Sequence, residues 1–136
     1  MALLSGDVDF NFDNIAAAAA NIRSGKLRAL AVTSAARSSA LPELPTLSEA
    51  GAAFGMRDFD ISTWFGLFAP AGLPAETTAR LNKAFADAMA TPEFRARMSA
   101  LMAEPAGGSA ADFGAFVRNE HTKYERLVKA SGASVD

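Results

Sequence analysis

The 136-residue sequence contains no cysteine and only one histidine, and its formal net charge is only −2. Without cysteine the chain has no disulfide, no thiol nucleophile and no cysteine-based zinc site, and a single histidine removes most histidine-based metal sites. A weakly acidic chain whose aromatic residues are not interleaved with a basic patch gives no case for a nucleic-acid partner. No apolar run approaches the roughly 20 residues of a membrane-spanning helix. We therefore predict no metal, no cofactor and no nucleic acid.

The residues that are present favour one α/β domain. Half of the residues are hydrophobic (50%), which is enough to build a core at this length. The first residues lack the basic segment, the apolar segment and the cleavage site of a signal peptide, and they read as the end of a helix. We expect the chain to be part of a larger protein.

Residues 59–74 form the stretch around which the rest is organised. They include the only tryptophan, Trp64, and they are rich in β-branched and aromatic residues before a Pro-Ala-Gly-Leu-Pro turn. This pattern predicts a strand buried on both faces. Before it, a strand at 8–13, a helix at 15–24 and a strand at 27–33 make a predicted βαβ unit, although the Leu and Ala content of 27–33 would also suit a helix. After it, the spacing of apolar residues predicts helices at 75–90, from 92 onward and from 110 to the glycine at 132.

Capping residues mark the predicted helix boundaries. Thr46 with Glu49 is typical of a capping box, and Ser109 with Asp112 is an imperfect version of the same motif. Glycines at 25, 51 and 132 are placed to end helices. Pro74 stands where the first residue of a helix is expected, after a residue that caps poorly.

Two groups of residues are candidates for a ligand site. Asp13 and Asn14 follow a predicted strand and open a predicted helix, where unpaired N–H groups favour an anion. Simple helix capping is the commoner role of such residues. Ser62, Thr63 and Trp64 offer two hydroxyls and an aromatic wall, as ligand pockets do, but they would equally suit a buried strand. The lone His121 has no evident catalytic partner, which argues against an enzyme.

Four blocks of sequence, in the same order, resemble one family, the Bug (Bordetella uptake gene) receptors of tripartite tricarboxylate transporters. The blocks are residues 6–14 (GDVDFNFDN), 24–34 (SGKLRALAVTS), 41–51 (LPELPTLSEAG) and 64–72 (WFGLFAPAG). Glu104-Pro105 and Asp112-Phe113 continue the likeness, so it covers nearly the whole chain.

The resemblance implies a partial type II periplasmic binding protein fold: a βαβ unit, a crossover strand and C-terminal helices. Residues 1–60 would be the C-terminal part of the second ligand-binding lobe, and residues 61–136 would be the crossover strand and the helices that return to the first lobe. Phe12, Asp13 and Asn14, and with them Ser62, Thr63 and Trp64, would be the ligand-binding positions that this sequence carries over. The turns that grip the ligand in the family would lie outside this sequence.

The function implied by the resemblance is that of a periplasmic solute receptor. It would bind a small carboxylate or amino acid and deliver it to the membrane permease subunits of the transporter, and it would not be an enzyme. The alternative is a truncated module that binds no solute and self-associates, as a homodimer for example, through exposed strand edges.

Overall fold

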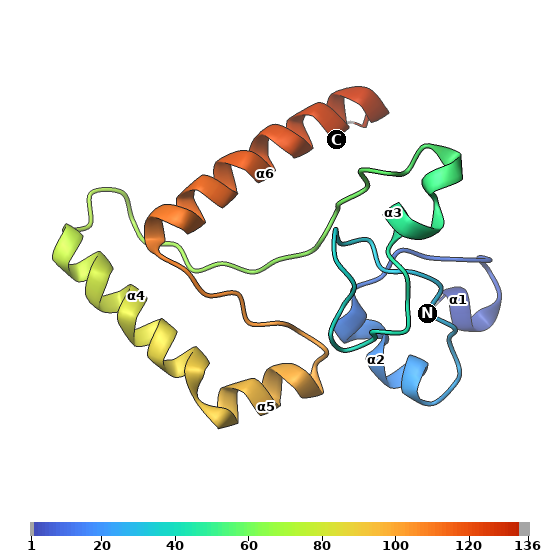
Figure 1. Ribbon diagram of the computed structural model, residues 1–136, viewed down its shortest axis with the longest axis horizontal. Coiled ribbons are helices and arrows are strands. Elements are labelled where there is room, and N and C mark those ends of the chain that lie inside the picture. The colour runs from blue at the N-terminus through green and yellow to red at the C-terminus, as the bar shows by residue number, and fades with distance from the viewer. Residues whose placement is uncertain (1, 134–136) are drawn as a thin grey trace. The chain divides into compact units, whose positions relative to one another are not determined.

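The computed structural model describes residues 2–133, which divide into two compact units (Figure 1). The first unit contains residues 2–68 and Pro92–Pro105, and the second contains Ala69–Thr91 and residues 106–133. The backbone therefore passes from one unit to the other after Phe68, after Thr91 and after Pro105.

The first unit contains short helices joined by long irregular segments. They are α1 (Ala2–Ser5), α2 (Ile15–Arg23), α3 (Leu47–Ala50), the 3-10 helix η1 (Ala52–Phe54) and α5 (Pro92–Ala100). The predicted helix at 15–24 is confirmed: the Asn14 side chain caps it by accepting a hydrogen bond from the Ala16 N–H (3.0 Å), and Gly25 follows at φ 71°. A positive φ at that point is what glycine provides without strain.

The predicted capping box at α3 is also confirmed. The Thr46 hydroxyl accepts a hydrogen bond from the Glu49 N–H at 3.0 Å, and the Glu49 carboxylate accepts one from the Thr46 N–H at 2.8 Å. Gly51 ends this single turn of helix, as predicted. Each residue satisfies the other's unpaired donor, which stabilises the start of a helix of only four residues.

The strands predicted at 8–13, 27–33 and 59–74 are not formed as strands within residues 2–133. The pairing that does occur there is one parallel bridge between Val32 and Thr46. Val32 N donates to Pro45 O (2.9 Å) and Leu47 N donates to Val32 O (2.8 Å), while Ile61 N donates to Thr33 O (2.9 Å). A strand requires continuous hydrogen bonding to a neighbour, and these segments have such a neighbour for one or two residues at most.

The buried core of the first unit is small. Its buried apolar residues are Ala18 and Ala19 of α2, Val32 of the bridge, and Leu41, and the bridge residue Thr46 is 2% exposed.

The second unit is a pair of helices, α4 (Ala75–Ala90) and α6 (Ala110–Ser131), which contact each other. Pro74 precedes the first helical residue instead of being it, and no side chain caps α4, in keeping with the weak start expected from the sequence. The Ser109–Asp112 capping box opens α6 and Gly132 ends it at φ 66°, both as predicted. Asn82 of α4 donates from Nδ2 to Gly108 O (3.1 Å), which ties the start of α6 to α4. Within residues 2–133 no helix is long and apolar enough to cross a membrane.

Candidate functional site

The residues at 12–14 lie at the start of α2. Phe12 is 68% exposed and contacts Phe10 edge to face, with ring centroids 6.2 Å apart. The Asp13 carboxylate accepts a hydrogen bond from the Asn14 N–H (2.9 Å), and Asn14 Oδ1 accepts one from the Ala16 N–H. The N–H groups of Ala17 and Ala18 donate to the Asn14 carbonyl. Capping therefore accounts for most of the donors at this helix start, and the ligand-binding role of Phe12, Asp13 and Asn14 stays a prediction.

The second group, Ser62 to Trp64, follows the point where Ile61 joins the bridge region. Asp60 Oδ1 accepts a hydrogen bond from the Ala35 N–H (3.0 Å), so the backbone is fixed immediately before the group. Ser62 and Trp64 are half-buried and Thr63 is exposed. Both groups belong to the first unit but stand on separate segments of it, and the role of the second group in binding also stays a prediction.

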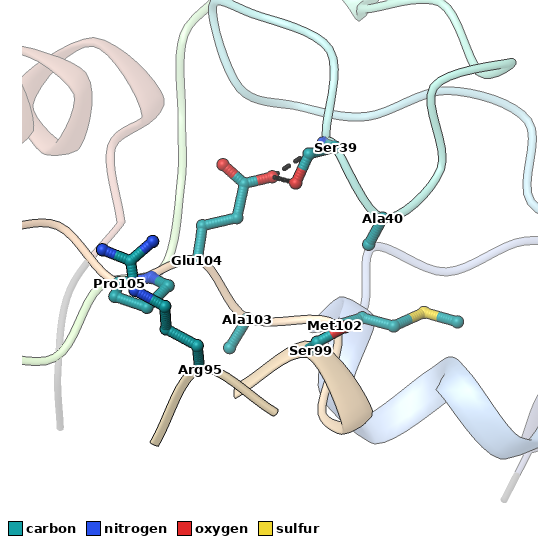
Figure 2. Close-up of a pocket in the computed structure, with 8 residues that line it drawn as sticks. All are labelled: Ser39, Ala40, Arg95, Ser99, Met102, Ala103, Glu104 and Pro105. Carbon is teal, nitrogen blue, oxygen red and sulfur yellow. Dashed lines mark hydrogen bonds between the residues drawn. The ribbon is translucent and has the colours of Figure 1, made fainter. Parts of the chain in front are cut away.

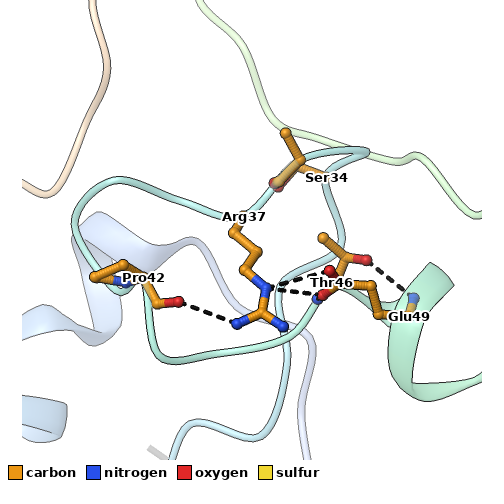
Figure 3. Close-up of polar contacts among 6 residues, drawn as sticks. Ser34, Arg37, Pro42, Thr46 and Glu49 are labelled. Carbon is orange, nitrogen blue, oxygen red and sulfur yellow. Dashed lines mark hydrogen bonds and ion pairs between the residues drawn. The ribbon is translucent and has the colours of Figure 1, made fainter.

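Arg37 and Glu49 hold the loop that runs between the two bridge residues, Val32 and Thr46 (Figure 3). Arg37 Nε lies 2.9 Å from Glu49 Oε2, and Arg37 Nη1 donates to Pro42 O at 3.3 Å. The hydrogen bond from the Thr46 backbone and the Arg37 side chain together lower the pKa of Glu49 from its ordinary value. All of these groups form hydrogen bonds or ion pairs with one another, so we assign them a structural role.

A cavity of about 340 Å³ lies at the carboxyl end of α5, within the first unit (Figure 2). It is lined by Ser39, Ala40, Arg95, Ser99, Met102, Ala103, Glu104 and Pro105. Glu104 Oε1 accepts hydrogen bonds from the Ser39 N–H and the Ser39 hydroxyl, both at 2.7 Å, and from the Ser38 hydroxyl at 3.3 Å. The two Ser39 donors are the main reason why the pKa of Glu104 is lowered.

Sequence reasoning found no role for Glu104 or Arg95. Glu104 meets Ser39 across 65 positions of sequence, and nothing local in either segment signals that contact. His121, by contrast, is exposed on α6, and within residues 2–133 no cluster of three or more metal-ligating side chains occurs.

Comparison with known proteins identifies the family of this chain. The family model described as the tripartite tricarboxylate transporter family receptor matches residues 1–133. A UPF0065 protein of Pseudomonas sp. strain P51, from the tcbD-tcbE intergenic region, is 34% identical over 126 residues, which are 93% of this chain and 37% of that protein.

Two solved structures are similar over most of the chain. The structure of R. palustris Rpa4515 with adipate has a TM-score of 0.79 and 33% identity, over 96% of this chain and 42% of that one. The periplasmic binding protein BugD has a TM-score of 0.69 and 33% identity, over 85% of this chain and 38% of that one.

These matches define a class, the periplasmic binding proteins, and this chain has part of their α/β fold. The chain belongs to the tripartite tricarboxylate transporter receptor family, and the resemblance to Bug receptors is confirmed. The family is one of receptors, not of enzymes. The chain spans about two fifths of the length of these three relatives (37%, 42% and 38%).

Proposed function

We propose that the chain is the C-terminal portion of a periplasmic receptor that binds a small carboxylate and delivers it to a membrane permease. The observation that carries this proposal is the similarity to Rpa4515, a relative solved with the dicarboxylate adipate, over 96% of the chain. The receptor family to which the chain belongs supports the step of delivery to a transporter.

In this proposal the ligand lies at the start of α2 and against the segment at 62–64. Asn14 Oδ1 is used in capping, which leaves the Nδ2 amide hydrogens of the same side chain to donate to a carboxylate. Residues 1–60 would belong to the second lobe of the receptor, and residues 61–136 would lead back to the first lobe. Closure of two lobes around the ligand would exclude water and strengthen these hydrogen bonds.

The test is a chimera in which this sequence replaces the matching segment of Rpa4515. Isothermal titration calorimetry with adipate, citrate and glutamate would measure which ligand class binds, on the chimera and on the 136-residue chain alone. The proposal requires that the folded chimera bind at least one of these carboxylates with micromolar affinity. A folded chimera that binds none of them would refute it.

A second candidate is a module that self-associates without binding solute. It is favoured by the exposure of large apolar side chains in the first unit, with Phe65 91% exposed, Phe10 69% and Leu30 66%. Apolar surface of this size is uncommon on a stable monomer. Carboxylate binding by the folded chimera separates the two candidates, because only a portion of a receptor is expected to bind there.

A further inference from the structure

The cavity at the end of α5 carries two charged side chains of opposite sign. Glu104 presents one carboxylate oxygen, Oε1, to three donors from Ser38 and Ser39, while no described residue donates to Oε2. Among residues 2–133, the Arg95 side chain makes no hydrogen bond and no ion pair, although it lines the same cavity. The cavity therefore offers one acceptor and one cationic donor that the protein itself leaves unused.

The other end of the cavity holds the apolar side chains of Met102 and Ala40, with Ser99 next to Met102. In the view of Figure 2, Arg95 and Glu104 lie toward one end of the segment at 102–105, and Met102 lies toward the other end beside Ala40. The volume of about 340 Å³ falls at the lower end of the roughly 300–1,000 Å³ range of ligand pockets. A small molecule with a charged head and a short apolar tail matches this division.

The backbone conformation of Met102 independently supports a ligand site in this cavity. Its φ of 53° lies in the left-handed region, in the hydrogen-bonded turn that closes α5, where Met102 N donates to Ser99 O and Ala103 N donates to Met98 O. Glycine is the residue that this turn favours. Strained backbone positions such as this one cluster at functional sites.

We propose that this cavity binds a zwitterionic amino acid with an aliphatic side chain, at a site separate from the one proposed for the carboxylate. The Arg95 guanidinium binds the ligand carboxylate, Glu104 Oε2 accepts hydrogen bonds from the ligand ammonium group, and Met102 contacts the aliphatic side chain. The paired charges exclude a simple dicarboxylate, since its second negative charge would meet Glu104.

The experiment is calorimetry on the 136-residue chain with L-leucine and with two analogues that each lack one charged group. The first analogue, 4-methylpentanoate, lacks the ammonium group, and the second, 3-methylbutylamine, lacks the carboxylate. L-leucine is expected to bind at least about tenfold more tightly than either analogue, because each analogue loses one charge-assisted interaction. Equal affinity for leucine and either analogue would overturn the proposal, as would the absence of binding up to about 10 mM leucine.

Variants locate the site. Arg95→Gln and Glu104→Gln are each expected to weaken leucine binding at least about tenfold. Arg80→Gln, which changes an arginine of α4 outside the cavity, should keep the affinity within about threefold. Unchanged leucine affinity in Arg95→Gln would overturn the assignment.

A last comparison separates this site from the proposed carboxylate site. In the Rpa4515 chimera, Arg95→Gln should leave adipate affinity unchanged while it weakens leucine binding at least about tenfold. Loss of adipate binding in the same variant would show one shared site and overturn the separate cavity. A folded chimera that binds none of adipate, citrate and glutamate, with leucine binding intact, would refute only the proposed carboxylate function.

Discussion

Met102 shows how a single backbone angle can be tested separately from its side chain. We compare Met102→Gly with Met102→Ala, since both remove the thioether but only alanine keeps the strain at φ 53°. The left-handed region costs a non-glycine residue roughly 1–2 kcal/mol, partly offset by the greater freedom of glycine in the unfolded chain. Met102→Gly should therefore be about 0.5–1 kcal/mol more stable than Met102→Ala.

Urea titrations of the two variants measure that difference directly. A Met102→Ala protein as stable as Met102→Gly would mean that the backbone relaxes at this position. It would also remove the support that the backbone of Met102 gives to a ligand site in the cavity.

Glu104 predicts a pH dependence of stability. Hydrogen bonds from Ser39 lower its pKa in the folded protein below the value of 4.5 expected without them. A carboxylate with a lowered folded-state pKa stabilises the protein above its unfolded-state pKa, and this stability is lost as the pH falls through the folded-state pKa. Urea titrations at neutral pH and at about pH 4 should show a smaller loss of stability in Glu104→Gln than in the unchanged chain. Equal losses would mean that the Ser39 contact is absent in solution.

Two substitutions at Asn14 distinguish its role in capping α2 from its proposed role in ligand binding. Asn14→Ser keeps an oxygen that can cap α2, whereas Asn14→Ala removes the cap at a cost of about 1 kcal/mol. If Nδ2 of Asn14 donates to the ligand, both variants should weaken adipate binding in the chimera by about tenfold or more. Calorimetry that finds full affinity in Asn14→Ser would leave Asn14 with capping alone.

At the scale of elements, the helix ends were the part of the fold that the sequence predicted well. Thr46 with Glu49 and Ser109 with Asp112 form the expected capping boxes, because each box depends on residues only three positions apart. Gly132 ends α6 for an equally local reason.

The prediction of strands was wrong because strands depend on residues that are distant in sequence. The composition of residues 27–33 is right for a strand, but within residues 2–133 it pairs only at Val32, with Thr46. A strand depends on a neighbour that its own sequence does not describe, and these relatives are more than twice as long as the segment matched here. The cavity was missed likewise, since Ser39 and Glu104 meet only in three dimensions.

The start of α6 provides the prediction at this scale. Ser109 accepts a hydrogen bond from the Asp112 N–H at 3.1 Å, and its own N–H donates to the Asp112 carboxylate at 3.1 Å. Ser109→Ala should cost about 1 kcal/mol of stability and lower the helical signal in circular dichroism. Ser131→Ala, at the other end of the same helix, should change stability by less than about 0.5 kcal/mol. Equal effects of the two substitutions would show that the capping box contributes nothing.

At the scale of the whole molecule, the small core and the exposed apolar side chains are two sides of one observation: few apolar residues are buried, and several large ones face solvent. Within residues 2–133 the buried apolar residues are two alanines, Val32 and Leu41, while Phe65, Phe10 and Phe12 are 91%, 69% and 68% exposed. In the longer relatives, further chain is available to cover the matching positions, and we propose that it does so. The 136-residue chain alone must cover this surface with another copy or leave it in water.

We therefore predict that the isolated chain self-associates and binds adipate weakly. Extended backbone at residues 8–13 and 59–68 has few hydrogen-bonded neighbours in the first unit, so a second copy can add to it edge to edge and bury the phenylalanines. Phe10→Ser with Phe65→Ser should shift the chain toward monomer in multi-angle light scattering, because it removes one highly exposed apolar side chain from each of these segments. Thr122→Ser on α6 serves as the control. A monomeric unchanged chain at micromolar concentration, stabilised by adipate in a thermal shift assay, would contradict both halves of this prediction.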